Sequence, residues 1–158
     1  HDFEKIFLDI LRHENIASRR PIYEQYDKNV QGITVIEPGA ADAGVIAPLR
    51  DRPELDEDDQ QIGVALSVDA NPRHGLISPY WQSANAVVES MRNVAAVGAT
   101  PWACTDCLNY GNPEKPTQMW QFVEGVKGIR DALTGVPLKH TAGTPDEYPV
   151  PCVSGNVR

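Results

Sequence analysis

The second half of the chain alternates short apolar segments with long amphipathic ones, and this order limits the possible folds more than any other feature of the sequence. Residues 83–97 and 117–133 repeat apolar side chains every three to four positions, which predicts two long helices. Residues 62–68, 102–108 and 151–157 are apolar, have the length of strands and adjoin Gly, Pro or Asn. The first of these three is expected to be a buried strand. Strands that alternate with helices in this way form a sheet with helices packed on it.

The first half of the chain predicts shorter elements. Residues 3–12 have helical spacing of apolar side chains, and a second helix is expected from Ser18, as its cap, to about Val30. Residues 32–39 and 43–49 predict two strands. The expected fold class is α+β, a mixed sheet with helices on one face.

The same pattern predicts the domain organisation. Residues 1–31 are expected to form a helical linker segment, followed by one domain over residues 32–158. The chain lacks an initiator Met and stops at Arg158 in the middle of a pattern, which indicates a piece of something longer whose domain is truncated at its C-terminal end. The charged run at 50–61 is expected to be a solvated loop, and 134–149 a loop bearing Gly and Pro.

Composition narrows the class of partner. The net charge of −8 weighs against a nucleic-acid surface, which needs clustered Lys and Arg. No apolar run approaches the roughly 20 residues that span a bilayer, so no membrane partner is expected. Three cysteines, an odd number, argue against a disulfide framework and favour the reducing cytoplasm.

Polar loops follow three of the predicted strands, at 69–75, 106–116 and 154–158. A strand fixes the backbone where a ligand could bind, and the loop supplies polar groups. Carboxylates and amides are ligands of hard cations, and glycines let a phosphate approach the backbone. The residues of these kinds are Asp69, Asp106, Asn71, Asn109, Asn112, Asn156, Gly111 and Gly155. The alternative is that they only shape turns; a P-loop and a GxGxxG motif are both missing from the sequence.

Two other groups of residues have a structural and a functional interpretation. Cys104 and Cys107 are three apart in a predicted strand, so they face opposite sides and cannot share a metal ion. Arg92 and Asn93 lie on the first long helix, where Arg92 is expected to pair with Asp69 or Asp106. Methionine and aromatic side chains on the helices, such as Trp120, are expected in the core.

Four stretches together resemble one enzyme family. They are IYEQYDKNVQG (22–32), ALSVDANPRHGLISPY (65–80), MRNVAAVGATPWACTDCLNYGNPEKPTQMWQ (91–121) and VSGNV (153–157). They are similar to the second half of the phosphoribosylformylglycinamidine synthase family, within the aminoimidazole ribonucleotide synthase (PurM-like) superfamily. The run TDCLN-x-GNPEKP is the most specific part. The resemblance covers nearly the whole chain except the loops 50–61 and 138–149.

The resemblance implies a fold and an activity. Family members contain two pairs of domains, and this chain resembles the N-terminal α+β domain of the second pair. The implied enzyme is an ATP-dependent ligase, which converts formylglycinamide ribonucleotide, ATP and ammonia from glutamine into the amidine. The implied partners are the remainder of the synthase chain and, in the small form of the enzyme, a glutaminase subunit and a small bridging subunit. Two such domains associate through their sheets in this family, so a homodimer of the isolated domain is expected.

The resemblance also assigns roles to a few residues. Asp106 and Gly155 match positions that contact ATP, and Asn156 matches a Mg²⁺ ligand. Ser154 and Arg158 depart from the family pattern, and a substrate contact expected at position 158 is not transferred to Arg158. A mirrored second site would contain Asp69, Arg92, Asn93 and Asn109. Asn93 stands where the first half has an aspartate, so this mirrored site is expected to bind metal-nucleotide weakly or only structurally.

No catalytic residue is expected within this chain, because the catalytic His loops of the family lie in its first half. The isolated fragment is therefore expected to be inactive. Two alternatives stay open: a non-catalytic dimerisation or scaffold module, and another ATP-using enzyme of the same superfamily. The sequence favours the small form of the synthase over the large fused form, without deciding between them.

Overall fold

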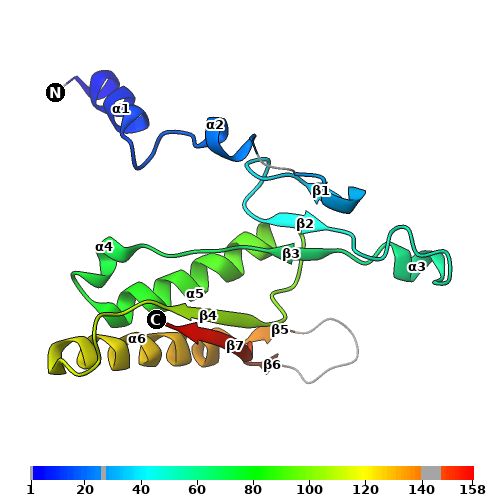
Figure 1. Cartoon of the computed structure of the whole chain (residues 1–158). Helices are drawn as coiled ribbons and strands as arrows, with labels where there is room; N and C mark the ends of the chain where they lie inside the picture. The colour runs from blue at the N-terminus through cyan, green and yellow to red at the C-terminus, as the bar shows by residue number, and fades with distance from the viewer. Residues whose placement is uncertain (1, 26–27, 140–146) are drawn as a thin grey trace.

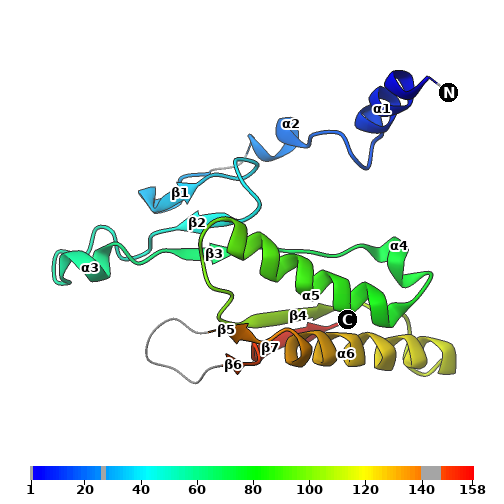
Figure 2. The same ribbon diagram turned by 180° about the vertical axis from the view of Figure 1, so that it is seen from behind.

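The computed structural model, which describes residues 2–25, 28–139 and 147–158, is built around two long helices that lie side by side. These are α5 (Pro79–Ala96) and α6 (Pro116–Gly135). Figures 1 and 2 show both helices on one side of the strands that precede and follow them. The predicted α+β class, with helices packed on one face of the strands, is confirmed.

The strands form three hydrogen-bonded groups. β1 (Thr34–Ile36), β2 (Gly44–Ile46) and β3 (Val64–Leu66) make an antiparallel sheet in that order. β4 (Cys104–Leu108) and β7 (Cys152–Val157) pair in parallel, with a register shift after Cys104. β5 (Leu138–Lys139) and β6 (Glu147–Tyr148) form a short antiparallel pair within the segment expected to be a loop. β3 and β4 are not hydrogen-bonded to each other, so the mixed sheet is interrupted between them.

Helix α5 begins one turn before the predicted start at Ser83. The hydroxyl of Ser78 accepts a hydrogen bond from the backbone N–H of Trp81 at 3.3 Å, and Pro79 occupies the first turn. A capping hydroxyl followed by proline is a strong helix start, because proline has no N–H that would be left without a partner. The chain leaves the helix at Gly98, which has a φ of 87° and adopts this left-handed conformation without steric cost.

Helix α6 packs with a face that the apolar pattern did not predict. Its buried residues are Gly125, Gly128, Ala132 and Leu133, whereas Trp120 is 56% exposed and Val126 40% exposed. The expectation that Trp120 lies in the core is therefore wrong. A Cβ at position 128 would lie 3.0 Å from the carbonyl carbon of Tyr80 and 3.2 Å from the nitrogen of Ala84. Glycine lets the two helix backbones approach closely, and this contact determines which face of α6 is buried.

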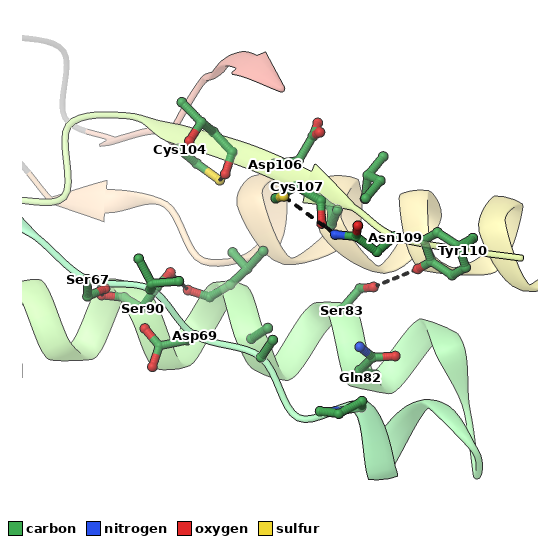
Figure 3. A pocket seen from close by; sticks show the side chains of 18 residues that line it. Ser67, Asp69, Gln82, Ser83, Ser90, Cys104, Asp106, Cys107, Asn109 and Tyr110 are labelled. Carbon is green, nitrogen blue, oxygen red and sulfur yellow. Dashed lines mark hydrogen bonds between the residues drawn. The ribbon is translucent and has the colours of Figure 1, made fainter. Parts of the chain in front are cut away.

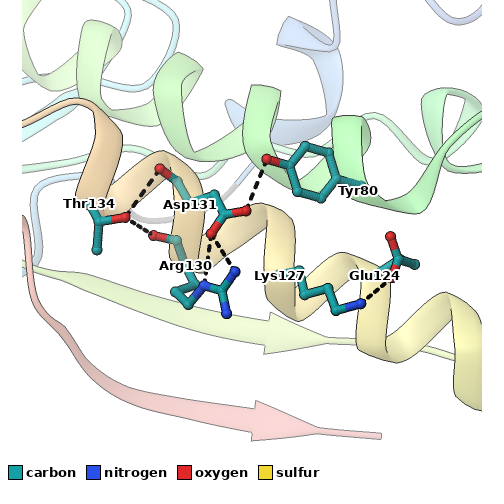
Figure 4. Close-up of polar contacts among 6 residues, drawn as sticks. All are labelled: Tyr80, Glu124, Lys127, Arg130, Asp131 and Thr134. Atoms are coloured by element: carbon teal, nitrogen blue, oxygen red, sulfur yellow. Dashed lines mark hydrogen bonds and ion pairs between the residues drawn. The ribbon is translucent and has the colours of Figure 1, made fainter.

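The two helices are also joined by polar contacts at their exposed side. The hydroxyl of Tyr80 donates a hydrogen bond to Asp131 at 3.1 Å, and Arg130 binds the same carboxylate at 2.7 Å (Figure 4). Arg130, and then the hydrogen bond from Tyr80, lower the pKa of Asp131, while this hydrogen bond raises the pKa of Tyr80. Lys127 and Glu124 form a further ion pair along α6 at 2.7 Å (Figure 4). Exposed pairs of this kind contribute little to stability.

The hydrophobic core is small and lies between the helices and one side of the strands. Its buried members are Ala84, Val87, Met91, Ala132, Leu133 and Val150. The strand at 62–68 was expected to be buried, but Val64, Leu66 and Val68 are exposed, Val68 by 98%. Successive side chains of a strand face opposite sides, and no helix of the described residues covers the outer side of β3. An apolar stripe is therefore left open to solvent.

The N-terminal part contains short elements that extend away from this core (Figure 1). α1 (Phe3–Arg12) forms as predicted, but none of its residues is buried. The second helix is only α2 (Arg20–Tyr23), with a 3-10 turn at Val30–Gly32; residues 26 and 27 of the expected helix lie outside the described residues. Gln31 and Gly32 have positive φ, which a helix cannot continue through. The boundary between residues 31 and 32 stays a prediction.

The expected loops contain two further single-turn helices. α3 (Glu57–Gln60) lies in the acidic run, capped by Asp56, and α4 (Pro72–Gly75) follows Asn71, which caps it. Over the described ranges, none of the helices is both long and apolar enough to cross a membrane.

Candidate functional site

A cavity of about 590 Å³ lies between β4 and the extended segment that follows β3. One wall is the segment 67–70, the opposite wall is β4 with Asn109 and Tyr110, and α5 lies beneath (Figure 3). The segment 67–70 continues from β3, so the strands place these walls, and α5 presents Ser83, Val87 and Ser90 to the cavity. Two of the three predicted polar loops, 69–75 and 106–116, thus contribute residues to one cavity, whereas 154–158 contributes none of the lining residues.

Asp106 and Gly155 are paired on neighbouring parallel strands. Their register places the Asp106 carboxylate directly over Gly155, where a Cβ would lie 2.6 Å from Oδ2 and closer still to Oδ1. Position 155 therefore has to be glycine for this arrangement of Asp106. Cys152 adds a weak contact, from its Sγ to Oδ2 of Asp106 at 3.6 Å.

Asn156 does not share this face of the strands. It pairs with Cys107, one position along from the Asp106–Gly155 pair, and side chains alternate between the faces of a strand. The roles that the family resemblance implies for Asp106, Gly155 and Asn156 would need all three on one side of the strands; the first two share a face and the third does not. Asn156 is exposed near the end of β7, so its side chain reaches solvent on the opposite face.

The mirrored pair Asp69 and Asn93 is in direct contact. The amide of Asn93 donates a hydrogen bond to Oδ1 of Asp69 at 2.8 Å, and one turn earlier on α5 the carbonyl of Ser90 accepts one from the Ser67 hydroxyl at 3.0 Å. These two contacts hold the segment after β3 onto α5. The second carboxylate oxygen, Oδ2, is buried and has no hydrogen-bond partner among the described residues. An unpaired buried acceptor costs free energy, so this carboxylate has capacity for one more donor.

The other two residues of the mirrored site lie apart from this pair. Arg92 is exposed, and within the described part of the chain it forms no ion pair with Asp69 or Asp106, which corrects the pairing expected from the sequence. Asn93, one position further along the helix, contacts Asp69 instead, because it faces the segment after β3. Asn109 turns back onto its own strand, donating to the carbonyl of Cys107 at 3.0 Å.

The three cysteines are free thiols. Cys104 is half-buried against the core, and Cys107 is exposed on the opposite face of β4, as alternation along a strand predicts. Burial raises the pKa of Cys104 to about 11 and also raises the pKa of Cys152. Among the residues the structure describes, no three His, Cys, Asp or Glu side chains are placed to hold a metal ion together.

Tyr110 and Ser83 were not singled out from the sequence, yet both line the cavity (Figure 3). The Tyr110 ring packs edge-on against Phe122 at 5.4 Å, and its hydroxyl lies 3.5 Å from the Ser83 hydroxyl. Gly125 makes room for this hydroxyl, since a Cβ there would lie 3.1 Å from Ser83 Oγ and closer to the Tyr110 ring. Tyr110 therefore fixes the start of the 109–116 loop on both helices.

The donor set fits a magnesium nucleotide in its chemistry. Mg²⁺ is commonly held by one or two protein oxygens together with phosphates and water, so a dedicated protein cage is not required. A carboxylate over Gly155 would repel a bare phosphate, and a cation between the two removes this repulsion. Asp106 is the carboxylate that would share such a cation at Gly155, and Asn156 would need to reach it from the other face of β7.

Comparison with known proteins gives a consistent result. Residues 40–158 match the family described as AIR synthase related protein, N-terminal domain. The chain is 56% identical over 156 residues to the phosphoribosylformylglycinamidine synthase subunit PurL of Methanothrix thermoacetophila, covering 99% of this chain and 19% of that relative. It is 47% identical over 131 residues to the PurL subunit of Thermomicrobium roseum, covering 82% of this chain and 17% of that relative.

A solved structure has the same fold. The structure of PurLQS from Thermotoga maritima superposes with a TM-score of 0.67 at 29% identity, covering 90% of this chain and 20% of that chain. The chain thus spans about a fifth of the length of the curated relatives and of the solved protein that it matches.

Proposed function

Because the chain belongs to the family of AIR synthase related proteins, N-terminal domain, we propose that it is one domain of a phosphoribosylformylglycinamidine synthase in purine biosynthesis. The identity of 56% over 99% of the chain to a PurL subunit supports this assignment. The proposed reaction joins ammonia from glutamine to formylglycinamide ribonucleotide, using ATP and releasing ADP and phosphate.

The proposed reaction has two steps. The amide oxygen of the substrate takes the terminal phosphoryl group of ATP, because an amide oxygen leaves poorly until it carries phosphate. Ammonia then attacks the carbon that carries this oxygen. The C–O bond breaks and phosphate departs, which leaves the amidine. Bound Mg²⁺ would neutralise charge on the phosphates during the transfer.

In this proposal the chain supplies contacts to the nucleotide rather than the reacting groups. The observation that carries it is the Asp106–Gly155 pair, since it places a carboxylate at a glycine on adjacent parallel strands. Asp106 would orient the magnesium phosphate, and Gly155 would leave the space that the Asp106 carboxylate occupies. The Mg²⁺ contact that the family resemblance implies for Asn156 would require its amide to reach the ion from the other face of β7. Catalytic groups would come from outside residues 1–158.

The test uses the longer polypeptide that contains this chain. Asp106→Asn keeps the size of the side chain and removes its charge, so the KM for MgATP is expected to rise and turnover to fall by about tenfold or more. Asp51→Asn, an exposed carboxylate outside the site, serves as the matched control and is expected to leave both values unchanged. Unchanged kinetics in Asp106→Asn would remove this residue from the nucleotide site. Absence of amidine formation in the unmodified polypeptide would contradict the assigned reaction.

The isolated chain is expected to be inactive and to bind nucleotide poorly. Among the described residues, the hydrogen-bond partner of the Asp69 carboxylate is the neutral amide of Asn93, so the mirrored site offers one charged group to a metal ion. Calorimetric titration of the 158-residue chain with MgATP is expected to give weak or undetectable binding. Binding below one micromolar would contradict a merely structural mirrored site.

The proposed partners follow from the relatives. The solved neighbour is PurLQS, so we propose a multi-subunit enzyme in which this chain's parent associates with a glutaminase subunit and a small bridging subunit. The free thiols suit the cytoplasm, which we propose as its location.

The exposed outer side of β3 also supports a role in association. Val64, Leu66 and Val68 form one apolar stripe, and exposed apolar patches mark interaction sites. The isolated chain is therefore proposed to dimerise through its sheet, and a purely structural dimerisation module is the second candidate function. Sedimentation of Leu66→Asp beside the unmodified chain tests this: the substitution is expected to abolish the dimer, and a dimer that persists would exclude this surface.

A further inference from the structure

We infer that Cys104 and Cys152 form a reversible disulfide site, which a small-molecule disulfide oxidises and a small-molecule thiol reduces. The observation behind this is that the two residues lie directly opposite each other on the neighbouring parallel strands β4 and β7. This assignment goes beyond the proposed function and does not rest on it, because it requires only the two thiols and an external oxidant.

The separation of the two residues fits a disulfide bond. Paired strands lie about 4.7–4.9 Å apart, and the α-carbons of natural disulfides lie about 4.4–6.8 Å apart. Residues that are directly opposite on paired strands also direct their side chains to the same face of the sheet. The pairing of Cys104 with Cys152 therefore meets the distance that the bond requires and places both thiols on one face.

An irregularity in β7 gives this pair room to adjust. Cys104 pairs with Cys152 and Thr105 pairs with Ser154, so the register assigns Val153 no partner on β4. An extra residue of this kind bends a strand locally. A disulfide needs its two β-carbons about 3.5–4.5 Å apart and a defined torsion about the sulfur–sulfur bond. Cys152 adjoins the extra residue, so it can move toward this geometry without disturbing the pairing from Thr105 onward.

The two thiols hydrogen-bond to each other and lie beside the same carboxylate. Sγ of Cys152 is 3.6 Å from Oδ2 of Asp106. Burial, followed by the neighbouring Cys152 and Asp106, raises the pKa of Cys104 to about 11, and burial followed by Asp106 raises the pKa of Cys152. A thiolate is therefore unfavourable here, whereas a pair of thiols and a disulfide both add no charge beside Asp106. The surroundings thus favour the two neutral forms between which a redox site exchanges.

The two cysteines differ in access to solvent. Cys152 is exposed on β7, whereas Cys104 is half-buried against the core. An external oxidant therefore reaches Cys152 first, and Cys104 is placed to react with the sulfur of Cys152 afterwards. This division matches an attacking cysteine beside a resolving cysteine.

Oxidation proceeds by two thiol–disulfide exchanges. The Cys152 thiol loses its proton and its sulfur attacks the small-molecule disulfide, whose sulfur–sulfur bond breaks to release one thiol and leave a mixed disulfide. Cys104 then loses its proton and attacks the Cys152 sulfur, which forms the protein disulfide and releases the second thiol. The cysteines lose two electrons and two protons, and the small molecule gains them. An excess of small-molecule thiol reverses both exchanges.

Cys107 provides an internal comparison. It lies on the opposite face of β4, where it pairs with Asn156, and the Asn109 amide is 3.5 Å from its sulfur. Alternation along the strand therefore separates it from the other two thiols. Cys107 is expected to end as a mixed disulfide with the small molecule.

Peptide mass spectrometry of the longer polypeptide tests the site. The folded polypeptide is incubated with glutathione disulfide at about pH 8.5, free thiols are blocked, and material that runs as a single polypeptide on a non-reducing gel is digested with trypsin. Cleavage after lysine and arginine places Cys104 and Cys107 in peptide 93–127 and Cys152 in a peptide that begins at residue 140. The two peptides are expected as one linked species, which dithiothreitol separates.

Variants identify the bonded pair. Cys107→Ser is expected to retain the linked species, which in these two peptides can then join only Cys104 to Cys152, whereas Cys104→Ser is expected to lose it. In urea, the unmodified polypeptide is expected to link Cys104 to Cys107 instead, because they are close in sequence. Loss of the linked species in Cys107→Ser would overturn the inference. Mixed disulfides with glutathione at both Cys104 and Cys152, without the linked species, would also overturn it.

Discussion

The carboxylate of Asp106 lies over the α-carbon of Gly155 on the neighbouring strand, in the space that a side chain at position 155 would fill. A short acidic side chain and a glycine therefore form one unit, although 48 residues separate them in the sequence. The position of the negative charge depends on the absence of a side chain at position 155 as well as on Asp106 itself.

Gly155→Ala is expected to force Asp106 out of this position. The added methyl group cannot coexist with the carboxylate, so Asp106 must adopt another rotamer, at a cost of about 1–3 kcal/mol in the free energy of unfolding. In the longer polypeptide, affinity for MgATP is expected to fall as well. Denaturant unfolding and calorimetry measure the two effects. Gly135→Ala is the control, because nothing lies within 4 Å of a Cβ there; equal behaviour of the two variants would contradict the close contact.

Asn93→Ala is expected to destabilise the chain through Asp69. The Asn93 amide is the only hydrogen-bond donor to this carboxylate among the described residues, and Oδ2 is already buried without a partner. Removing the amide leaves the carboxylate unpaired, which costs about 1–3 kcal/mol. Urea unfolding measures this loss, with Asn85→Ala on the exposed side of the same helix as the control. If both variants unfold at the same midpoint, the contact does not stabilise the fold.

Gly128→Ala is expected to separate α5 from α6. A methyl group at position 128 would contact the backbone of Tyr80 and Ala84, which cannot rotate away as a side chain can. The cost is expected to be about 1–3 kcal/mol or more, exceeding the gain in helix propensity of up to about 1 kcal/mol. Thermal unfolding measures the balance. A rise in Tm would mean that the helices are further apart than the structure places them.

The cysteines are expected to differ in reactivity toward iodoacetamide. Burial raises the pKa of Cys104 to about 11 and also raises that of Cys152, so both remain largely thiols at pH 7.5. Cys107 is exposed and is expected to be modified first, and Cys104 last. Peptide mass spectrometry after timed labelling gives the order. Modification of Cys104 ahead of Cys107 in the folded chain would contradict its placement against the core.

The raised pKa of Cys104 also links stability to pH. Its pKa is about 11 in the folded chain against 9.0 as the ordinary value, so the folded state keeps the proton over a range in which the unfolded state loses it. Stability from this group is thus present below pH 9 and lost as pH rises toward 11. Unfolding midpoints measured across this range are expected to fall less in Cys104→Ser than in the unmodified chain. An identical fall in both would assign the effect to other groups.

The sequence by itself determined the order of the main elements. The two long helices and the strands at 104–108 and 152–157 follow from apolar periodicity and turn residues, because these are local properties of the chain. The sequence also indicated Asp106 and Gly155 as candidate site residues, because each belongs to a polar segment at the end of a predicted strand. Short motifs within those segments were enough to indicate the family.

Tertiary structure decided which face of each helix and strand is buried and which side chains lie on the same side. Apolarity favoured Trp120 for the core, but close helix contact selects small residues, so Gly125 and Gly128 are buried instead. Asn156 faces away from Asp106 because strand register, which depends on residues far apart, sets its side. The interruption of the sheet between β3 and β4 could not be predicted from the sequence either. Pairing between strands depends on contacts across the fold rather than on a property of either segment.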